Sequence, residues 1–324
     1  MDATTILVGD IGGTNARFAM VTADNDGLHV SDVWKQKGAD FPTFLHALDA
    51  YLQHTQAPPA GAAFGVAGAV SQGRVELLHR NWTLDAREIS GRLGGVRTVV
   101  VNDFFAMARA APELPAADLT DIAPGEADDE AAIAVGGPGT GFGIAVLRRI
   151  PNGWVVVAGE GGHQTYVPVT ELEWRVAENL RAQGLYVSAE VVCSGSGFEQ
   201  TRAALAEAMK LRELKLDQAG IIAAAGQGDP FALEFCRLRA RTVMTSMGNM
   251  ALAAKATGGV CLAGGVSQHL IPWLREKSAL DRFRLRGPRT QLLSNIPITL
   301  IVSETAPLLG AARLWLDEET RGWL

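Results

Sequence analysis

Two glycine-rich turns of similar design, each joining two apolar segments, constrain the fold of this chain most. The first turn is Gly12-Gly13-Thr14-Asn15, and the second is Gly137-Pro138-Gly139-Thr140-Gly141. The residues on either side of each turn have the pattern of strands, so each turn is predicted to be the tip of a β-hairpin. One glycine-tipped hairpin is most often only a turn. Two of them in one chain predict a duplicated unit.

The same glycines favour contact with an anion. Without a Cβ atom, the main-chain N–H groups of such turns can approach a phosphate closely. Asp10 ends the apolar segment before the first turn and would repel phosphates unless a cation lay between them, so Mg²⁺ is expected there. Neither turn is followed by a P-loop lysine, and the first does not open a helix as a dinucleotide-binding turn does. The pattern therefore disfavours Walker-type NTPases and hydride transfer.

Length and composition predict a globular protein of two domains. The chain has 324 residues, of which 48% are hydrophobic. Its formal charge is −6 with lysines and arginines scattered, which disfavours binding to nucleic acid or to an anionic membrane. The three cysteines are far apart in apolar contexts, and no uncharged apolar run reaches spanning length. A soluble cytoplasmic protein with reduced thiols is expected.

Periodicity predicts the element order β-β-β-α-β-α-β-α, which begins again after an acidic connection over 112–130. The second half carries additional helices, and a final helix is expected to pack back on the first domain. The predicted segments are strands at 4–10, 16–23, 28–35, 62–67, 98–101, 154–157, 259–263 and 298–302 and helices near 41–54, 85–93 and 230–256.

Several polar residues stand where a site could form. Asn102 and Asp103 follow a buried strand, at the sheet edge where α/β sites assemble, and Asp103 could take a proton from a hydroxyl. Asp103 is equally well placed to cap the helix that follows. Its role stays open at this level.

Three further segments also have two interpretations. Glu160 and His163 lie in a glycine-rich loop suited to binding hydroxyls, or form a surface turn. Glu190 is an acid within an apolar segment, and an exposed helix position explains it as well. Gly264 and Gly265 could let a helix N-terminus approach a ligand or could form a tight strand-to-helix joint.

Taken in order, these segments resemble the bacterial glucokinase family, the branch without the zinc motif, within the actin-like superfamily of sugar kinases. The resemblance spans nearly the whole chain. It rests on Val-Gly-Asp-Ile-Gly-Gly-Thr-Asn-Ala-Arg-Phe at 8–18, Val-Asn-Asp-Phe at 101–104, Gly-Pro-Gly-Thr-Gly at 137–141, Gly-Glu-Gly-Gly-His at 159–163, Ser-Ala-Glu at 188–190 and Leu-Ala-Gly-Gly at 262–265.

The resemblance implies an α/β fold of two actin-like, ribonuclease H-like domains with a cleft between them, the second with helical insertions. The predicted limits are 1–112 with 305–324 for the small domain and 113–304 for the large one. The implied activity is ATP-dependent phosphorylation of glucose at its 6-hydroxyl. A homodimer is expected from the resemblance alone.

The resemblance also assigns roles to residues. Asp103 would be the catalytic base, and Asp10 would orient hydrated Mg²⁺. The sugar would bind to Asn102, Asp103, Glu160, His163 and Glu190. ATP would bind to Asp10, Gly12, Gly13, Thr14, Asn15, Gly139, Thr140, Gly141, Gly264 and Gly265.

Two departures from the family pattern concern sugar preference and affinity. Where the family has a Thr-Asn pair before a Trp, this chain has His79-Arg80-Asn81, and the family's Ser-Gly-Pro-Gly is Ser194-Gly195-Ser196-Gly197. Two other functions remain alternatives: a non-catalytic sugar sensor, and a kinase for another hexose or a small carboxylate. The absence of a basic DNA-binding segment weighs against the sensor, and acidic candidate loops weigh against a carboxylate substrate.

Overall fold

The computed structural model describes the chain except for residues 1–2, 56–57, 78–80, 152 and 318–324. It divides into two compact units, one of residues 1–114, 150–156 and 303–324 and the other of residues 115–149 and 157–302. No helix in the described ranges is both long and apolar enough to cross a membrane.

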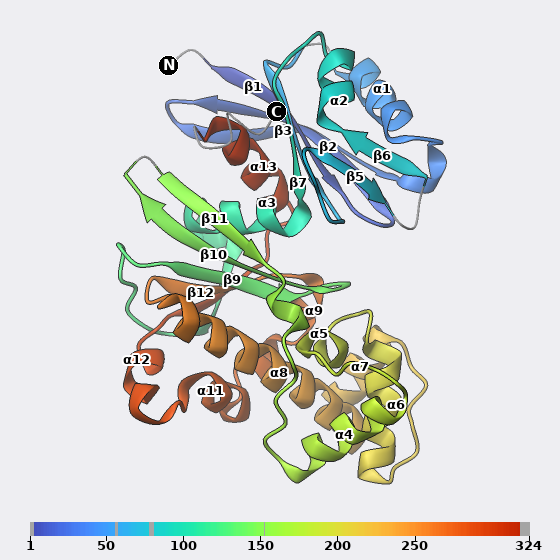
Figure 1. Ribbon diagram of the computed structural model, residues 1–324, viewed down its shortest axis with the longest axis vertical. Coiled ribbons are helices and arrows are strands. Elements are labelled where there is room, and N and C mark those ends of the chain that lie inside the picture. The colour runs from blue at the N-terminus through green and yellow to red at the C-terminus, as the bar shows by residue number, and fades with distance from the viewer. Residues whose placement is uncertain (1–2, 56–57, 78–80, 152, 318–324) are drawn as a thin grey trace. The chain divides into compact units, whose positions relative to one another are not determined.

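The first unit is built on a five-stranded sheet with the order β3-β2-β1-β4-β7 (Figure 1). The first three strands are antiparallel, and β4 and β7 continue the sheet in parallel with β1. The strands are β1 (Thr4–Ile11), β2 (Asn15–Asp24), β3 (Gly27–Lys37), β4 (Gly61–Val66) and β7 (Thr98–Asn102). The helices are α1 (Phe44–His54), α2 (Ala86–Arg92), α3 (Asp103–Ala110) and α13 (Ala306–Leu316).

Both faces of this sheet are covered. Because side chains alternate between the two faces along each strand, one strand contributes to two separate cores. On β1, Leu7 and Ile11 pack in the cluster that includes α1, whereas Ile6 and Val8 pack in the cluster that includes α13. The final helix therefore completes the core of the first unit, as the sequence predicts.

Close contact at one glycine fixes this helix. A Cβ atom on Gly61 of β4 would lie 2.1 Å from the ring of Trp315 on α13. The indole Nε1 of Trp315 donates to the carbonyl of Arg97 at 2.9 Å. Only glycine at position 61 leaves room for this ring.

The second sheet has six strands in the order β11-β10-β9-β12-β13-β8. Its hairpin of β9 and β10 and its parallel strands β12 and β13 repeat the arrangement of the first sheet, as the predicted duplication requires. The strands are β8 (Leu119–Ala123), β9 (Ile133–Pro138), β10 (Phe142–Ile150), β11 (Gly153–Gly159), β12 (Gly259–Leu262) and β13 (Ile298–Ile301).

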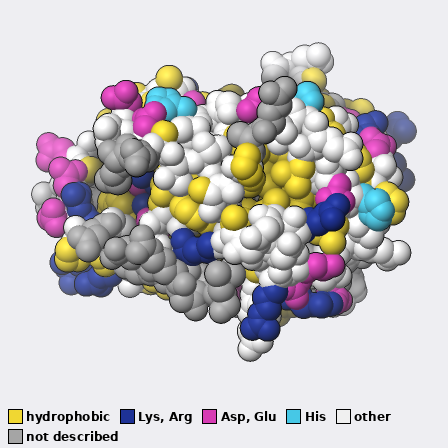
Figure 2. Space-filling view, turned by 90° about the horizontal axis from the view of Figure 1, so that it is seen from above, with side chains coloured by type: hydrophobic (Ala, Val, Ile, Leu, Met, Phe, Trp, Pro, Cys, Tyr) yellow, Lys and Arg dark blue, Asp and Glu magenta, His cyan; other side chains and the backbone are white. Residues whose placement is uncertain are grey.

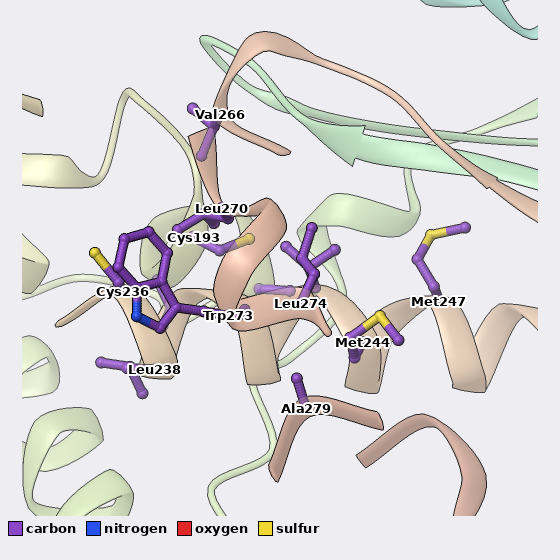
Figure 3. Packing of buried hydrophobic residues seen from close by; sticks show 14 of the residues in the cluster. Cys193, Cys236, Leu238, Met244, Met247, Val266, Leu270, Trp273, Leu274 and Ala279 are labelled. Carbon is purple, nitrogen blue, oxygen red and sulfur yellow. The ribbon is translucent and has the colours of Figure 1, made fainter. Parts of the chain in front are cut away.

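The additional helices of the second half surround the long helix α8. Figure 3 shows part of their apolar core, where Leu270, Trp273 and Leu274 lie among side chains of α8 such as Met244. The helices are α4 (Glu171–Ala182), α5 (Ala189–Cys193), α6 (Phe198–Met209), α7 (Gln218–Gly226), α8 (Pro230–Ala254), α9 (Gly265–His269), α10 (Ile271–Leu274), α11 (Lys277–Arg284) and α12 (Thr290–Ser294).

Three short strands escape the sequence prediction. The connection over 112–130 contains β8, which pairs with β13, and the short strands β5 (Arg74–Leu77) and β6 (Trp82–Asp85) form a separate hairpin. The predicted connection over 112–130 therefore includes a strand that the sequence did not indicate. Strands of four or five residues are too short for their alternation to stand out.

Candidate functional site

In the first unit, two carboxylates lie at neighbouring strand ends. Asp10 is the seventh residue of β1, and Asp103 begins α3 directly after β7. Between these strands lies β4, whose Gly65 is in register with Asp10 and with Val101. A Cβ atom on Gly65 would lie 3.3 Å from the Cα of Asp103, so the absence of a side chain lets Asp103 approach the sheet.

Burial raises the pKa of Asp103 to about 6, and repulsion from the Asp10 carboxylate adds to this rise. One hydrogen bond acts in the opposite direction, because Oδ1 of Asp103 accepts from the N–H of Phe104 at 2.8 Å. Burial also raises the pKa of Asp10, although the nearby charges of Arg17 and Lys35 oppose the effect. The first unit thus holds two partly desolvated carboxylates that repel each other.

The helix cap is Asn102 and not Asp103. The Asn102 Oδ1 accepts from the Phe104 N–H at 2.9 Å, and its Nδ2 donates to the carbonyl of Gly68 at 3.1 Å. The capping interpretation of Asp103 is therefore wrong, because Asp103 is the first residue of the helix, although its Oδ1 accepts from the same N–H. Asn102, a predicted sugar ligand, uses part of its hydrogen-bonding capacity within the protein.

The first glycine turn has room for a ligand at its main chain. A Cβ atom on Gly13 would meet nothing within 4 Å, and one on Gly12 only the carbonyl of Asn15 at 3.6 Å. Neither glycine has a positive φ. Steric openness, and not a left-handed backbone, is therefore what glycine provides here. Thr14 and Asn15 complete the turn and are exposed.

The second glycine turn is similarly open at its tip and closely packed at its base. A Cβ atom on Gly139 would meet nothing within 4 Å, whereas one on Gly137 would lie 1.9 Å from the carbonyl oxygen of Ala263. Gly264 has a φ of 86°, and its Cβ would lie 2.4 Å from the carbonyl oxygen of Pro138. Gly264 and Gly265 thus lie at the joint between β12 and α9, with Gly264 directly against this turn.

Predicted sugar ligands of the second unit come together from two segments. The imidazole Nδ1 of His163 lies 4.0 Å from Oε1 of Glu190, and its Nε2 lies 3.9 Å from Oε2 of Glu160. The Glu190 side chain is only 20% exposed, so the exposed-helix interpretation of this residue is wrong. Glu160 and His163 are largely exposed.

Glu190 also bonds to the second glycine turn. Its Oε2 accepts from the N–H of Phe142 at 2.7 Å, and a Cβ atom on Gly141 would lie 2.8 Å from the same oxygen. A Cβ atom on Gly162 would lie 2.1 Å from the carbonyl oxygen of the same residue, Phe142. In this unit, the segments predicted to bind sugar and the segment predicted to bind phosphate therefore meet at Phe142. The sequence did not indicate this contact.

One departure from the family pattern is partly outside the described residues. His79 and Arg80 of that departure lie outside the described residues. The other departure, at Ser196, is described, and the Ser196 N–H donates to the carbonyl of Thr140 at 2.8 Å. On the face in Figure 2, acidic and basic side chains are intermixed.

Comparison with known proteins places this fold among the sugar kinases with two actin-like α/β domains. A ROK hexokinase from Thermus thermophilus shares the fold alone, with 20% identity, a TM-score of 0.69 and coverage of 98% of this chain and 100% of that one. The glucokinase family model matches residues 7–318. The chain belongs to the glucokinase family, so the predicted fold class and family are confirmed.

Individual relatives support the same assignment to the glucokinase family. The glucokinase of Nitrobacter hamburgensis is 35% identical, covering 96% of this chain and 97% of that protein, and the one from Saccharophagus degradans is 33% identical, with 96% and 98% covered. A crystal structure of glucokinase from an Antarctic psychrotroph has 34% identity, a TM-score of 0.86 and coverage of 95% and 97%. The chain spans 48% of the bifunctional protein glk of Burkholderia pseudomallei, at 33% identity.

Proposed function

We propose that this protein transfers the γ-phosphoryl group of ATP to the 6-hydroxyl of glucose, giving glucose 6-phosphate. Membership of the glucokinase family supports this activity. The observation that carries the proposal is the carboxylate of Asp103, at the carboxyl end of β7 and with its pKa raised to about 6. Such a carboxylate is ionised at neutral pH yet basic enough to accept the proton of a hydroxyl.

Each of the two open glycine turns supports binding of ATP phosphates. Residues Gly12, Gly13, Thr14 and Asn15 of one unit, and Gly139, Thr140 and Gly141 of the other, would bind phosphate oxygens through their main chain. The N–H groups of Gly12 and Gly139 already donate to the carbonyls of Asn15 and Gly141 at 2.9 and 2.8 Å, so these two glycines would contribute open space and not donors. Gly264 packs against the second turn, and Gly264 and Gly265 would lie near the adenosine. Phosphoryl transfer demands mainly positioning and charge neutralisation, which such turns provide.

The environment of Asp10 fits a hydrated Mg²⁺ ion. Its carboxylate is partly desolvated and lies near a second carboxylate, and a divalent cation would relieve that repulsion. When bound, Mg²⁺ would neutralise charge on the transferred phosphoryl group. Asp10 would hold the ion through its water ligands.

Acidic and neutral polar side chains would bind the remaining sugar hydroxyls. In the second unit these are Glu160, His163 and Glu190, with the imidazole between the two carboxylates. In the first unit Asn102 lies next to the base. Carboxylates accept hydrogen bonds from neighbouring hydroxyls, which suits a neutral polyol better than an anionic substrate.

An assay of ADP release with ATP and Mg²⁺ over a panel of sugars tests the activity. We expect glucose to give the highest kcat/KM, mannose and glucosamine less, and the Asp103→Asn variant to be nearly inactive with all of them. Sugar binding without ADP release would favour the sensor, and a preference for another sugar would reassign the substrate. The domain limits, the homodimer and the cytoplasmic location stay predictions.

A further inference from the structure

Arg239 on α8 is a buried cation whose partners in the described structure are all neutral. It is 2% exposed. Its Nε and Nη2 donate to the carbonyl of Cys193 at 3.1 and 2.9 Å, and Nη2 also donates to the carbonyl of Ser194 at 3.2 Å. The guanidinium lies over the rings of Phe198 and Phe235, 5.5 and 5.4 Å from their centroids.

The other buried arginines are paired differently. Arg109 and Arg202, which are 2% and 6% exposed, each form ion pairs with two carboxylates. No ion pair among the described residues includes Arg239. Burial lowers the pKa of Arg239 to about 10, which leaves it protonated at neutral pH. Burying a charge without a counterion costs free energy of folding, so the presence of Arg239 at this position needs an explanation.

The carbonyls that Arg239 binds end the short helix α5. The last carbonyls of a helix have no partners within the helix and carry partial negative charge. Arg239 supplies donors to both Cys193 and Ser194 with one rigid group, which a single ammonium could not do in the same geometry. It thereby fixes where the chain leaves α5.

The segment from Glu190 to Ser196, called here the 190–196 segment, is in turn bonded to the second glycine turn at two points and to Phe142, the residue after that turn, at a third. Gly195 and Ser196 donate their N–H groups to the carbonyls of Gly139 and Thr140 at 2.9 and 2.8 Å. Glu190 accepts from Phe142 at 2.7 Å. The path from Arg239 to the glycine turn therefore consists of consecutive hydrogen bonds and one short piece of chain.

We infer that Arg239 is a positioning residue, which holds the second phosphate turn and Glu190 in their binding geometry through the 190–196 segment. The consequence for catalysis rests on the proposed function, whereas the mechanical link does not. Replacing Arg239 leaves two buried carbonyls without donors, so the 190–196 segment loosens and the turn loses its support. ATP and sugar binding should then weaken together.

Hydrogen–deuterium exchange tests the link without any assumption about activity. In Arg239→Met, peptides covering 139–142 and 190–196 should exchange about tenfold faster, the factor that one hydrogen bond to a charged group is worth. The control is Arg241→Met, two residues along α8, which removes ion pairs with Glu173 and Glu234. Equal changes in these peptides in both variants, or none in Arg239→Met, would overturn the inference.

Kinetics then separate positioning from loss of stability. Arg239→Met should raise the KM for ATP and for glucose about tenfold each. Ser196→Pro removes the N–H that reaches Thr140, and Ser196→Ala keeps it. A double-mutant cycle of Arg239→Met with Ser196→Pro should be non-additive in the KM for ATP, whereas additive effects would contradict the path through this segment.

Two further results complete the test. If Arg239→Met does not fold, Arg239→Lys takes its place in both experiments, with a smaller rise in exchange and in KM expected because one ammonium replaces the planar group. Wild-type exchange and KM in the lysine variant would overturn the inference. If the wild-type protein does not phosphorylate glucose, the proposed function fails, while the exchange experiment still decides the role of Arg239.

Discussion

The carboxylate of Glu190 accepts a hydrogen bond at 2.7 Å from the main-chain N–H of Phe142, 48 residues away in the sequence. One oxygen of a predicted sugar ligand is thus engaged by the hairpin that carries the second phosphate turn. The other oxygen lies 4.0 Å from the imidazole of His163. In the second unit, the residues expected to bind sugar and those expected to bind ATP are therefore not independent.

Charge and hydrogen bonding at Glu190 can be separated by two substitutions. Glu190→Gln keeps an oxygen that can accept from Phe142 but loses the charge, so the KM for glucose should rise by a factor that corresponds to about 1.5–3 kcal/mol. Glu190→Ala loses both, so the KM for ATP should rise as well. Steady-state kinetics in both substrates check this. An unchanged KM for ATP in Glu190→Ala would show that the hydrogen bond does not support the phosphate turn.

Replacing the base should affect turnover more than binding. Asp103→Asn should lower kcat by a factor on the order of 10²–10⁴, because the amide cannot accept the proton. Glucose affinity, measured by calorimetry, should stay near that of the wild type. Circular dichroism serves as the control for folding. Turnover close to that of the wild type would exclude Asp103 as the base.

The raised pKa of Asp103 predicts an acid limb in the pH profile. The active form is the carboxylate, so activity should be lost as the pH falls through about 6, roughly tenfold per pH unit below that value. Both substrates should be kept far below their KM values, so that the profile reports the unliganded protein. The Asp103→Asn variant should lack this limb. A limb that persists in the variant belongs to another group.

The open first turn predicts a loss of binding without a loss of stability. Gly13→Ala adds a Cβ atom that meets no protein atom within 4 Å, so the melting temperature should change little. The methyl group would occupy the space through which phosphates approach the main chain, so the KM for ATP should rise. Gly226→Ala, in which the Cβ also meets nothing, is the matched control. Equal ATP kinetics in the two variants would remove the first turn from the ATP site.

The final helix should contribute strongly to stability. Leu308 is fully buried in the cluster beneath β1 and β4, so Leu308→Ala should destabilise the first unit by about 2–5 kcal/mol. Leu285→Ala, at a side chain that is 60% exposed, is the control. Thermal unfolding followed by tryptophan fluorescence measures both. Similar melting temperatures for the two variants would contradict the packing described here.

The sequence predicts the long elements because their periodicity is local. Strand β1 is buried on both faces and contains a continuous apolar run in the sequence, and α8 is a helix of 25 residues. Strand β8 has no such signal, since its position is set by pairing with β13, which lies far along the chain. Tertiary pairing, and not local propensity, decides such short strands.

The candidate site, like the fold, has a part that the sequence predicts and a part that it does not. Residue types and order identify Asp103 and Glu190 as candidates, and the family resemblance supplies their roles. The contributions of Gly65, Phe142 and Arg239 could not be predicted, because each depends on a main-chain atom or a buried space that only the folded chain brings near. No local sequence pattern encodes such a contact.

The Gly61–Trp315 contact has a consequence for biosynthesis. The apolar surface formed by Ile6, Val8 and Ala63 is covered by α13 together with Ala106 of α3, and α13 follows all the strands of both sheets in the sequence. A nascent chain that has emerged from the ribosome as far as the second sheet still displays that surface to water. Until residues 306–316 have been synthesised, the amino-terminal half therefore lacks part of its core and stays exposed to chaperones and to aggregation.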